Sequence, residues 1–155
     1  MTHLDARPAG LTFRFAVLAD CPLLAQLNHQ LVRDEGHRNR MTVVELEERM
    51  RGWLSDDTEY RAVLFEERAE IIAYALFREG PEQIYLRQLF VVPQRRRQGI
   101  GRKAVDLLRT RVWSRTKRLT VDVLVTNTGA VGFWRAVGYK DYCLTLEIQP
   151  EHLMA

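Results

Sequence analysis

Cysteine is scarce in this chain of 155 residues. The two cysteines, Cys21 and Cys143, lie far apart, and neither a Cys-x-x-Cys pair nor a neighbouring histidine gives the spacing of a zinc site. A disulfide framework is typical of small secreted chains that are rich in cysteine. We therefore expect two buried, reduced thiols with no chemical role, and the sequence predicts no metal site.

Long apolar runs are also missing. No run approaches the ~20 residues that a helix needs to cross a bilayer. Residues 1–10 lack the charged start and apolar middle of a signal peptide. We therefore expect a soluble cytoplasmic protein with no membrane partner.

The length and the hydrophobic content of 46% suit one folding unit with its own core. Two ordinary domains would need a longer chain, and no repeat, low-complexity stretch or linker divides this one. The sequence predicts a single domain over residues 1–155.

The net charge of +3 is modest, but basic residues gather in the second half of the chain. A nucleic-acid binder is therefore an alternative, although it would need exposed aromatic residues among the basic ones, or a recognition helix. The helix expected after residue 99 instead carries the apolar stripe of a core-facing helix. We interpret the following basic residues as a solvated face and predict no nucleic-acid partner. The basic residues are Arg95, Arg96, Arg97, Arg102, Lys103, Arg109, Arg111, Arg115, Lys117 and Arg118, and the stripe is Ile100, Ala104, Leu107, Leu108 and Val112.

Hydrophobic periodicity and turn residues predict the order of the elements. Charged turns between three middle strands indicate an antiparallel meander, and the apolar run at 119–125 predicts a strand covered on both sides. Thr42 and Glu45 form a capping box at the start of a helix. Strands are expected at 11–17, 60–65, 71–77, 84–92, 119–125 and 139–148, and helices from Asp20 to near Gly36, from Thr42 to Asp56, from near Ile100, and from Asn127 or Thr128 to Gly138.

The segment from Leu89 to Gly101 joins a strand to a helix through a basic turn that contains glycines. Gly99 and Gly101 lack side chains, so their backbone N–H groups can approach an anion, and the start of the helix adds its partial positive charge. Arg96 and Arg97 add formal charge. The spacing fits neither a P-loop nor a Rossmann fingerprint. The segment is typical of a pyrophosphate cradle.

Two motifs carry a resemblance to a known family. Arg96-x-x-Gly99-x-Gly101 resembles the acyl-CoA motif of the GNAT N-acetyltransferase superfamily. Residues 127–139, Asn-Thr-Gly-Ala-Val-Gly-Phe-Trp-Arg-Ala-Val-Gly-Tyr, resemble its second signature, Asn-x-x-Ala-x-x-Phe-Tyr-x-x-x-Gly-Phe/Tyr. The order of elements extends the resemblance over nearly the whole chain. It implies an α+β fold with a mostly antiparallel mixed sheet, flanked by helices, whose fourth and fifth strands splay apart.

The resemblance implies acetyl-CoA as the acyl donor, held in the gap between the splayed strands. The backbone of the fourth strand would hold the pantetheine arm, with the Leu89 N–H as the donor to the thioester oxygen. Asn127 would contact the same arm, although it is also a candidate helix cap, and the two roles can coexist. The implied cofactor-binding residues are Leu89, Phe90, Val91, Arg96, Arg97, Gln98, Gly99, Ile100, Gly101, Arg102, Asn127, Phe133 and Trp134.

The sequence departs from the family pattern at two positions that carry catalytic groups in other members. Trp134 stands where many members carry a tyrosine that protonates the leaving thiolate, and an indole N–H has no useful acidity. Tyr85 stands where some members carry a basic glutamate, and a phenol with an ordinary pKa of ~10 is a poor base. It is a candidate for orienting the substrate or a water molecule.

Candidates for binding the amine acceptor lie near the first two helices and on the fourth strand. Glu35 could attract a cationic amine, and His37 could take its proton. Arg87, beside Tyr85, could bind a carboxylate or phosphate of the acceptor. The leading hypothesis is an acetyl-CoA-dependent N-acetyltransferase for a small-molecule or peptide amine. This hypothesis is compatible with a homodimer. The alternative is a CoA-binding module without transferase activity.

Overall fold

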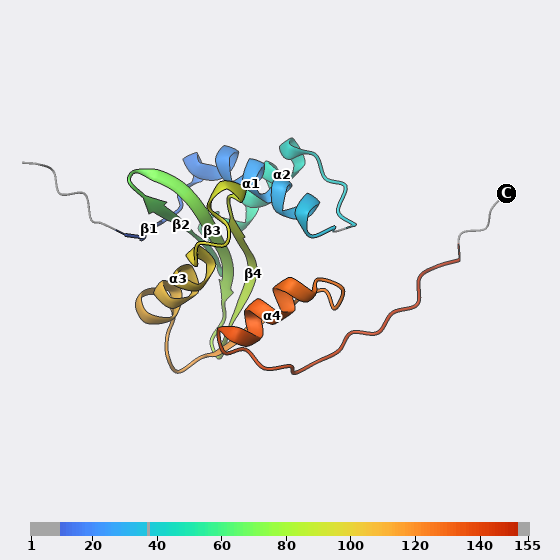
Figure 1. Cartoon of the computed structure of the whole chain (residues 1–155). Helices are drawn as coiled ribbons and strands as arrows, with labels where there is room; N and C mark the ends of the chain where they lie inside the picture. Colours follow the sequence, from blue (N-terminus) through green and yellow to red (C-terminus); the bar gives the residue numbers. More distant parts are fainter. Residues whose placement is uncertain (1–9, 37, 152–155) are drawn as a thin grey trace, which may run out of the picture.

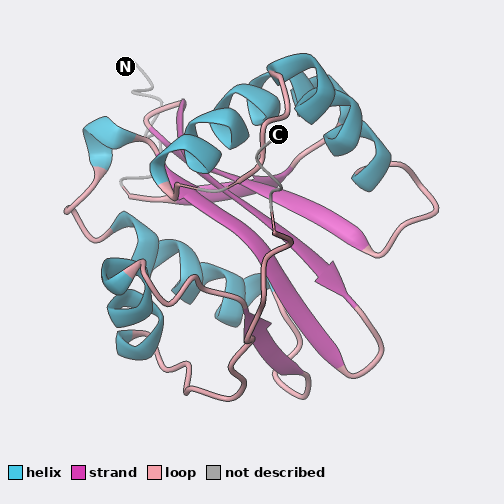
Figure 2. Cartoon of the chain, turned by 90° about the vertical axis from the view of Figure 1, so that its right-hand side faces the viewer, coloured by secondary structure: helices cyan, strands magenta, loops and turns pink. Residues whose placement is uncertain are grey.

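The computed structural model describes residues 10–36 and 38–151. A five-stranded sheet in the order β1-β2-β3-β4-β5 lies between two layers of helices (Figures 1 and 2). The strands are β1 (Thr12–Phe15), β2 (Tyr60–Glu67), β3 (Glu70–Glu79), β4 (Gln83–Val91) and β5 (Arg118–Val121). The α-helices are α1 (Cys21–Asp34), α2 (Val43–Trp53), α3 (Ile100–Leu107) and α4 (Thr128–Ala136). Short 3₁₀ turns cover Leu18–Asp20 and Pro93–Arg95, and α3 ends in a π turn at Leu108–Val112.

The helix starts follow local signals in the sequence. The Thr42 hydroxyl accepts from the Glu45 N–H at 3.2 Å, and the Glu45 carboxylate accepts from the Thr42 N–H at 3.1 Å, so the predicted capping box is confirmed. Pro22 occupies the first turn of α1, where its missing N–H leaves no hydrogen bond unmade. Across residues 10–36 and 38–151, each helix is too short or too polar to cross a membrane.

The sheet is mixed, and its last pair of strands opens. β1 to β4 pair antiparallel, whereas β4 and β5 run parallel. Gln83–Leu86 pairs with Arg118–Val121, after which β5 ends while β4 continues to Val91. The predicted fold class, with splayed fourth and fifth strands, is confirmed.

Two apolar clusters cover the two faces of the sheet. On one face, α1 and α2 contribute Leu24 and Met50, which pack with Leu64 and Tyr74 of the strands. On the other face, α3 packs on the sheet and Trp134 of α4 lies at the edge of the cluster. Because β3 contributes buried residues to both clusters, the sheet separates the two helical layers.

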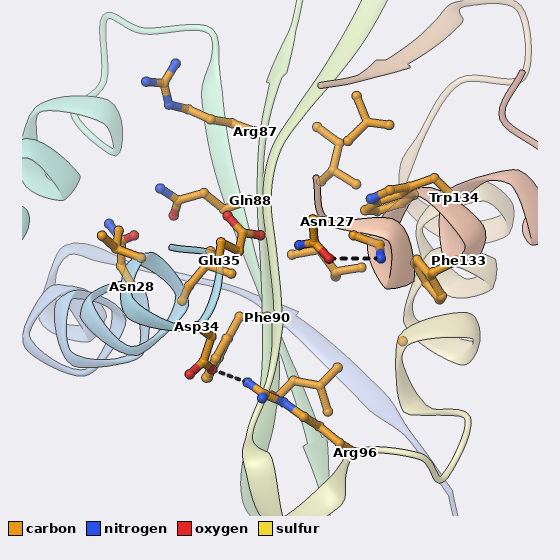
Figure 3. A pocket seen from close by; sticks show the side chains of 18 of the residues that line it. Asn28, Asp34, Glu35, Arg87, Gln88, Phe90, Arg96, Asn127, Phe133 and Trp134 are labelled. Carbon is orange, nitrogen blue, oxygen red and sulfur yellow. Dashed lines mark hydrogen bonds and ion pairs between the residues drawn. The ribbon is translucent and has the colours of Figure 1, made fainter. Parts of the chain in front are cut away.

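A bulge in β4 changes the direction of its side chains. Residues 76 and 77 of β3 lie opposite Gln88 and Leu86, so Arg87 is an extra residue without a partner. Leu86 belongs to the cluster under α3, whereas Gln88 accepts a hydrogen bond at 2.8 Å from Tyr74 on the α1 and α2 side. Because of the bulge, Arg87 and Gln88 both lie on the α1 and α2 side of the strand (Figure 3).

Three predictions about the C-terminal third were wrong. The fifth strand, expected at 119–125 and covered on both sides, spans Arg118–Val121 and is only partly buried, because β5 is an edge strand of the described sheet. Residues 139–150 form no strand but an extended segment along which Tyr142, Leu146 and Ile148 are 84%, 83% and 99% exposed. Cys143, expected to be buried, is exposed for the same reason, whereas Cys21 is buried in α1. An alternating pattern predicts a strand but cannot supply its partner.

Candidate active site

One cavity of about 780 Å³ runs from the basic turn before α3, through the gap beyond β5, to the space between β4 and helices α1 and α2. It is therefore lined by segments that lie far apart in the sequence (Figure 3). Of the predicted site residues that the structure describes, all but Gln98 line the cavity. The side-chain oxygen of Gln98 instead accepts a hydrogen bond from Arg95 Nε at 2.9 Å. His37 lies outside the described residues.

The turn before α3 presents backbone donors to the cavity. Gly99, the N-cap of α3, has φ 75° and ψ 13°, a left-handed conformation that glycine adopts without strain. The first intrahelical bond is the Lys103 N–H to the Gly99 carbonyl at 3.1 Å, so the N–H groups before Lys103 in this turn have no helical partner. Free donors at a helix start form a site for an anion.

The lack of a side chain at Gly101 matters for helix packing rather than for backbone conformation. A Cβ atom at Gly101 would lie 3.3 Å from the ring of Phe133, whereas one at Gly99 would meet nothing within 4 Å. Gly101 therefore lets α3 approach α4, and the two glycines of the motif have different physical roles.

The arginines of the turn divide into paired and unpaired residues. Arg95 forms an ion pair with Glu67 at 2.7 Å, and Arg96 forms one with Asp34 of α1 at 2.5 Å (Figure 3). In the described part of the chain, Arg97 and Arg102 have no ion pair. Their charges are available to an anion in the turn.

The open edge of β4 offers backbone groups to the gap. The Val92 N–H donates to the Ile72 carbonyl of β3 at 2.9 Å. Because N–H groups along an antiparallel strand alternate between its two edges, those of Leu89 and Val91 point away from β3. The Val91 carbonyl also points away, since it accepts from Arg96 Nε at 3.0 Å. The splay thus leaves the Leu89 N–H unpaired by any ladder and directed into the cavity.

The opposite wall of the gap comes from α4. Asn127 caps this helix, because its Oδ1 accepts from the Ala130 N–H at 3.2 Å, so the predicted cap is confirmed. Its amide nitrogen remains a donor on the cavity side (Figure 3). The rings of Phe133 and Trp134 pack edge to face, 4.9 Å between centroids, and give the gap an apolar wall.

Tyr85 lies at the far end of the gap beside Asp122, a residue that sequence reasoning missed. The Tyr85 hydroxyl donates to Asp122 Oδ2 at 3.0 Å. Burial, and next this hydrogen bond, raise the pKa of Tyr85 to about 12. The phenol is therefore protonated at neutral pH and is a hydrogen-bond donor rather than a base.

The comparison with protein families matches residues 25–139 to the model described as the acetyltransferase (GNAT) family. The chain belongs to the GNAT acetyltransferase family. The predicted family is thereby confirmed over the segment that contains both motifs. A comparison with curated proteins gives no match.

Solved structures share the GNAT fold with this chain. A possible acetyltransferase from Clostridium difficile 630 superposes with a TM-score of 0.74 at 14% identity, covering 92% of this chain and 99% of that one. An aminoglycoside N-acetyltransferase in complex with CoA gives 0.70 at 16% identity over 96% and 100% of the two chains. Ribosomal-protein-alanine N-acetyltransferase from Brucella melitensis biovar Abortus 2308 gives 0.66 at 15% over 90% and 99%. At these identities the likeness concerns the fold.

In this GNAT domain the second half of the cavity lies between β4, α1 and α2. Sequence reasoning placed Glu35 and Arg87 there, and both line it. It missed three polar residues, Asn28, Arg49 and Gln88, which also line it. Asn28 sits within the apolar stripe of α1, and a polar residue in such a stripe is the one signal that could have drawn attention to it. No group of three potential metal ligands occurs in residues 10–36 or 38–151.

Proposed function

We propose that this protein transfers an acetyl group from acetyl-CoA to a primary amine by direct attack within a ternary complex. The observation that carries the proposal is the continuity of one cavity from an anion-binding turn to an open strand edge and on to a polar chamber. A donor with a diphosphate at one end and a thioester at the other would need such a path, and the chamber leaves room for a second substrate.

The chain's own groups suit this donor, which supplies the activated thioester. Backbone N–H groups around Gly99 and the unpaired Arg97 and Arg102 would bind the diphosphate. The open edge at Val91 would pair with the amides of the pantetheine arm. The Leu89 N–H would donate to the thioester oxygen as negative charge develops on it.

The reaction itself needs little from the side chains. The amine nitrogen bonds to the carbonyl carbon, the carbon–sulfur bond breaks, and the thiolate gains a proton while the amine loses one. Trp134 cannot supply that proton, and Tyr85 keeps its own. We infer that water in the cavity carries the proton and that positioning provides most of the rate enhancement.

A CoA-binding module without transferase activity is the second candidate. It is favoured by the indole of Trp134 at the place of a family acid and by the hydrogen bond that fixes Tyr85 to Asp122. It differs from the first candidate in one result, because it predicts tight CoA binding with no turnover.

Two measurements test the proposal. Titration calorimetry with acetyl-CoA should show weaker binding for Gly99→Trp, which fills the turn, and about 10-fold weaker binding for Arg102→Glu. Arg115→Glu makes the same charge change at an exposed turn away from the cavity and should bind normally. Equal affinity in all variants would remove the assignment of the turn.

Thiol release across polyamines, amino acids, aminoglycosides and peptide N-termini then separates the two candidates. Turnover with any acceptor supports the transferase. Tight acetyl-CoA binding with no turnover across the panel supports the binding module.

We also propose that two copies of this chain form a dimer by exchanging the segment 140–149. Its alternate residues Tyr142, Leu144, Leu146 and Ile148 are exposed, and no backbone hydrogen bond joins residues 140–150 to the rest of the described chain. The free edge of β5 borders a groove of about 1210 Å³. An unpaired extended segment and an unpaired strand edge in one chain are complementary, so two copies can satisfy each other.

The exchanged segment would also border the active site, because the groove along β5 shares Tyr85, Arg87 and Trp134 with the first cavity. Light scattering after size-exclusion chromatography should give a dimer for the natural chain and a monomer for Leu146→Lys. Thr145→Lys, on the other face of an extended segment, should remain dimeric. A monomeric natural chain, or a dimeric Leu146→Lys chain, would contradict the exchange.

A further inference from the structure

Two arginines face the polar chamber from different elements and meet at one aromatic ring. The guanidinium carbon of Arg49, on α2, lies 4.6 Å from the centroid of the Trp53 ring, and that of Arg87, on β4, lies 4.7 Å from it. Both side chains line the cavity. Two positive charges beside one ring repel each other, so their proximity costs free energy unless a negative charge joins them.

The described chain supplies no carboxylate partner to either arginine. Arg87 donates to the hydroxyl of Tyr60 at 3.3 Å, and Arg49 Nε is buried with no hydrogen-bond partner. Burial, and next the charge of Arg87, lower the pKa of Arg49, as expected for a cation without a counterion. By contrast, Arg61, which also stacks on a ring at 4.2 Å, forms an ion pair with Glu79 and lies outside the cavity.

A buried amide in the same chamber is also unsatisfied. Asn28 is 0% exposed, and neither its amide nitrogen nor its oxygen has a hydrogen-bond partner. A buried polar group without a hydrogen-bond partner destabilises the fold unless a ligand or water satisfies it. Asn28, Glu35 and Gln88 lie on the same side of β4 as Arg87 (Figure 3). The chamber thus brings together two arginines without a carboxylate partner, the Glu35 carboxylate and the unsatisfied amide of Asn28, which suits a ligand that is both charged and polar.

We propose that the amine acceptor of this enzyme carries an anionic group, a carboxylate or a phosphate, that Arg49 and Arg87 bind between α2 and β4. This inference rests on the proposed transferase function and names its substrate class. Arginine presents several donors in a planar fork that matches a carboxylate or a phosphate oxygen pair. Glu35, in the same cavity, would attract the ammonium group, so an amino acid or a phosphorylated amine fits and a polycation does not.

The test uses pairs of acceptors that differ in one charge. Glycine is compared with glycinamide, and O-phosphoethanolamine with ethanolamine, by thiol release at equal concentrations of neutral amine. The anionic member should have about 10- to 100-fold higher kcat/KM, and the pair with the larger ratio identifies the anion as carboxylate or phosphate. Arg49→Gln and Arg87→Gln should lose this preference while keeping the natural affinity for acetyl-CoA.

Arg61→Gln is the matched control, because it removes a stacked arginine outside the cavity, and it should keep the preference. If a glutamine variant fails to fold by circular dichroism, Arg87→Lys replaces it; the charge remains but the fork is lost, so part of the preference should remain. The inference would be wrong if the natural enzyme turned over glycinamide, ethanolamine or spermidine as fast as the anionic acceptors, or faster. That result would leave the proposed transferase function standing.

A binding experiment keeps the inference independent of turnover. N-acetylglycine and N-acetylglycinamide resemble an acetylated product with and without the anion, and each is titrated into the CoA-saturated protein. Only N-acetylglycine should bind, and Arg49→Gln should abolish its binding. Should no acceptor turn over, this result would support the anion site in a protein that is not a transferase. Absence of N-acetylglycine binding to the natural protein would sink the site.

Discussion

Gly101 tests whether the contact between α3 and α4 shapes the donor half of the cavity. An added Cβ would lie 3.3 Å from two atoms of the Phe133 ring and 3.9 Å from a methyl group of Val91. The optimum separation of two carbons is about 3.5–4.0 Å, so the ring must move by a few tenths of an ångström. It cannot do so freely, because Phe133 packs edge to face on Trp134.

The magnitude follows from two opposing terms. Overpacking costs about 1–3 kcal/mol, and alanine regains up to about 1 kcal/mol of helix propensity over glycine. We expect Gly101→Ala to be destabilised by about 1 kcal/mol, which lowers the Tm by about 2–4 °C in a chain of this size. Gly101→Val adds three carbons, two more than alanine, and should lose about 3 kcal/mol.

Differential scanning calorimetry measures the stability, and titration with acetyl-CoA measures the function. Gly101→Val should bind the coenzyme at least about 10-fold more weakly, because the displaced Phe133 carries Asn127 and Trp134 with it. Gly132→Ala is the control, since an added Cβ there meets nothing within 4 Å. It should gain about 0.5–1 kcal/mol. An unchanged Tm and affinity in Gly101→Val would refute the reasoning.

Three further changes probe the site and its scaffold. Asp34→Asn frees Arg96 from its 2.5 Å ion pair, so calorimetry should show about 2- to 5-fold tighter binding of acetyl-CoA if Arg96 reaches the diphosphate. Unchanged or weaker binding would mean that the ion pair between Arg96 and Asp34 serves only to stabilise the fold. Because the raised pKa of about 12 keeps Tyr85 protonated, the pH–rate profile of Tyr85→Phe should keep the natural apparent pKa values between about pH 6 and 10. A displaced alkaline limb would show that this phenol titrates during turnover. Thr42→Ala removes the cap of α2 and should cost about 1 kcal/mol, seen as a Tm lower by about 2–4 °C; an equal Tm would mean that the cap contributes nothing.

The features that were predictable from the sequence are those whose cause lies within a few residues. The glycine turn before α3 is one, because the left-handed Gly99 and the unpaired N–H groups depend on its immediate neighbours. The caps at Thr42 and Asn127 are others, since each side chain binds an N–H three residues ahead. These signals locate the residues of the proposed donor half of the cavity.

The proposed acceptor half of the cavity depends on contacts between distant residues. Arg49, Trp53 and Arg87 come from two elements, and the bulge that directs Arg87 exists only through the register between β3 and β4. The hydrogen bond from Tyr85 to Asp122 likewise joins β4 to the residue that follows β5, at the point where the two strands separate. No local pattern encodes a register, so these residues were missed or had no assigned neighbour.

The expected strand at 139–148 also shows that a local sequence pattern does not specify a pairing partner. Its alternation is present in the sequence, but residues 139–150 pair with no strand within one molecule, and β5 remains an edge strand. A strand is a property of two segments, and one sequence specifies only one of them. The partner in our proposal is the free edge of β5 in a second copy.

The bulge at Arg87 separates two uses of one strand. Beyond it, the open edge of β4 presents the N–H of Leu89 to the gap where the thioester would lie, and edge groups are fixed by the backbone. At the bulge, Arg87 and Gln88 present their side chains to the chamber where an amine would lie. Because the edge needs no particular side chain, the acceptor face of β4 can change without disturbing the donor site. A strand of this kind can keep one donor while its side chains select the acceptor.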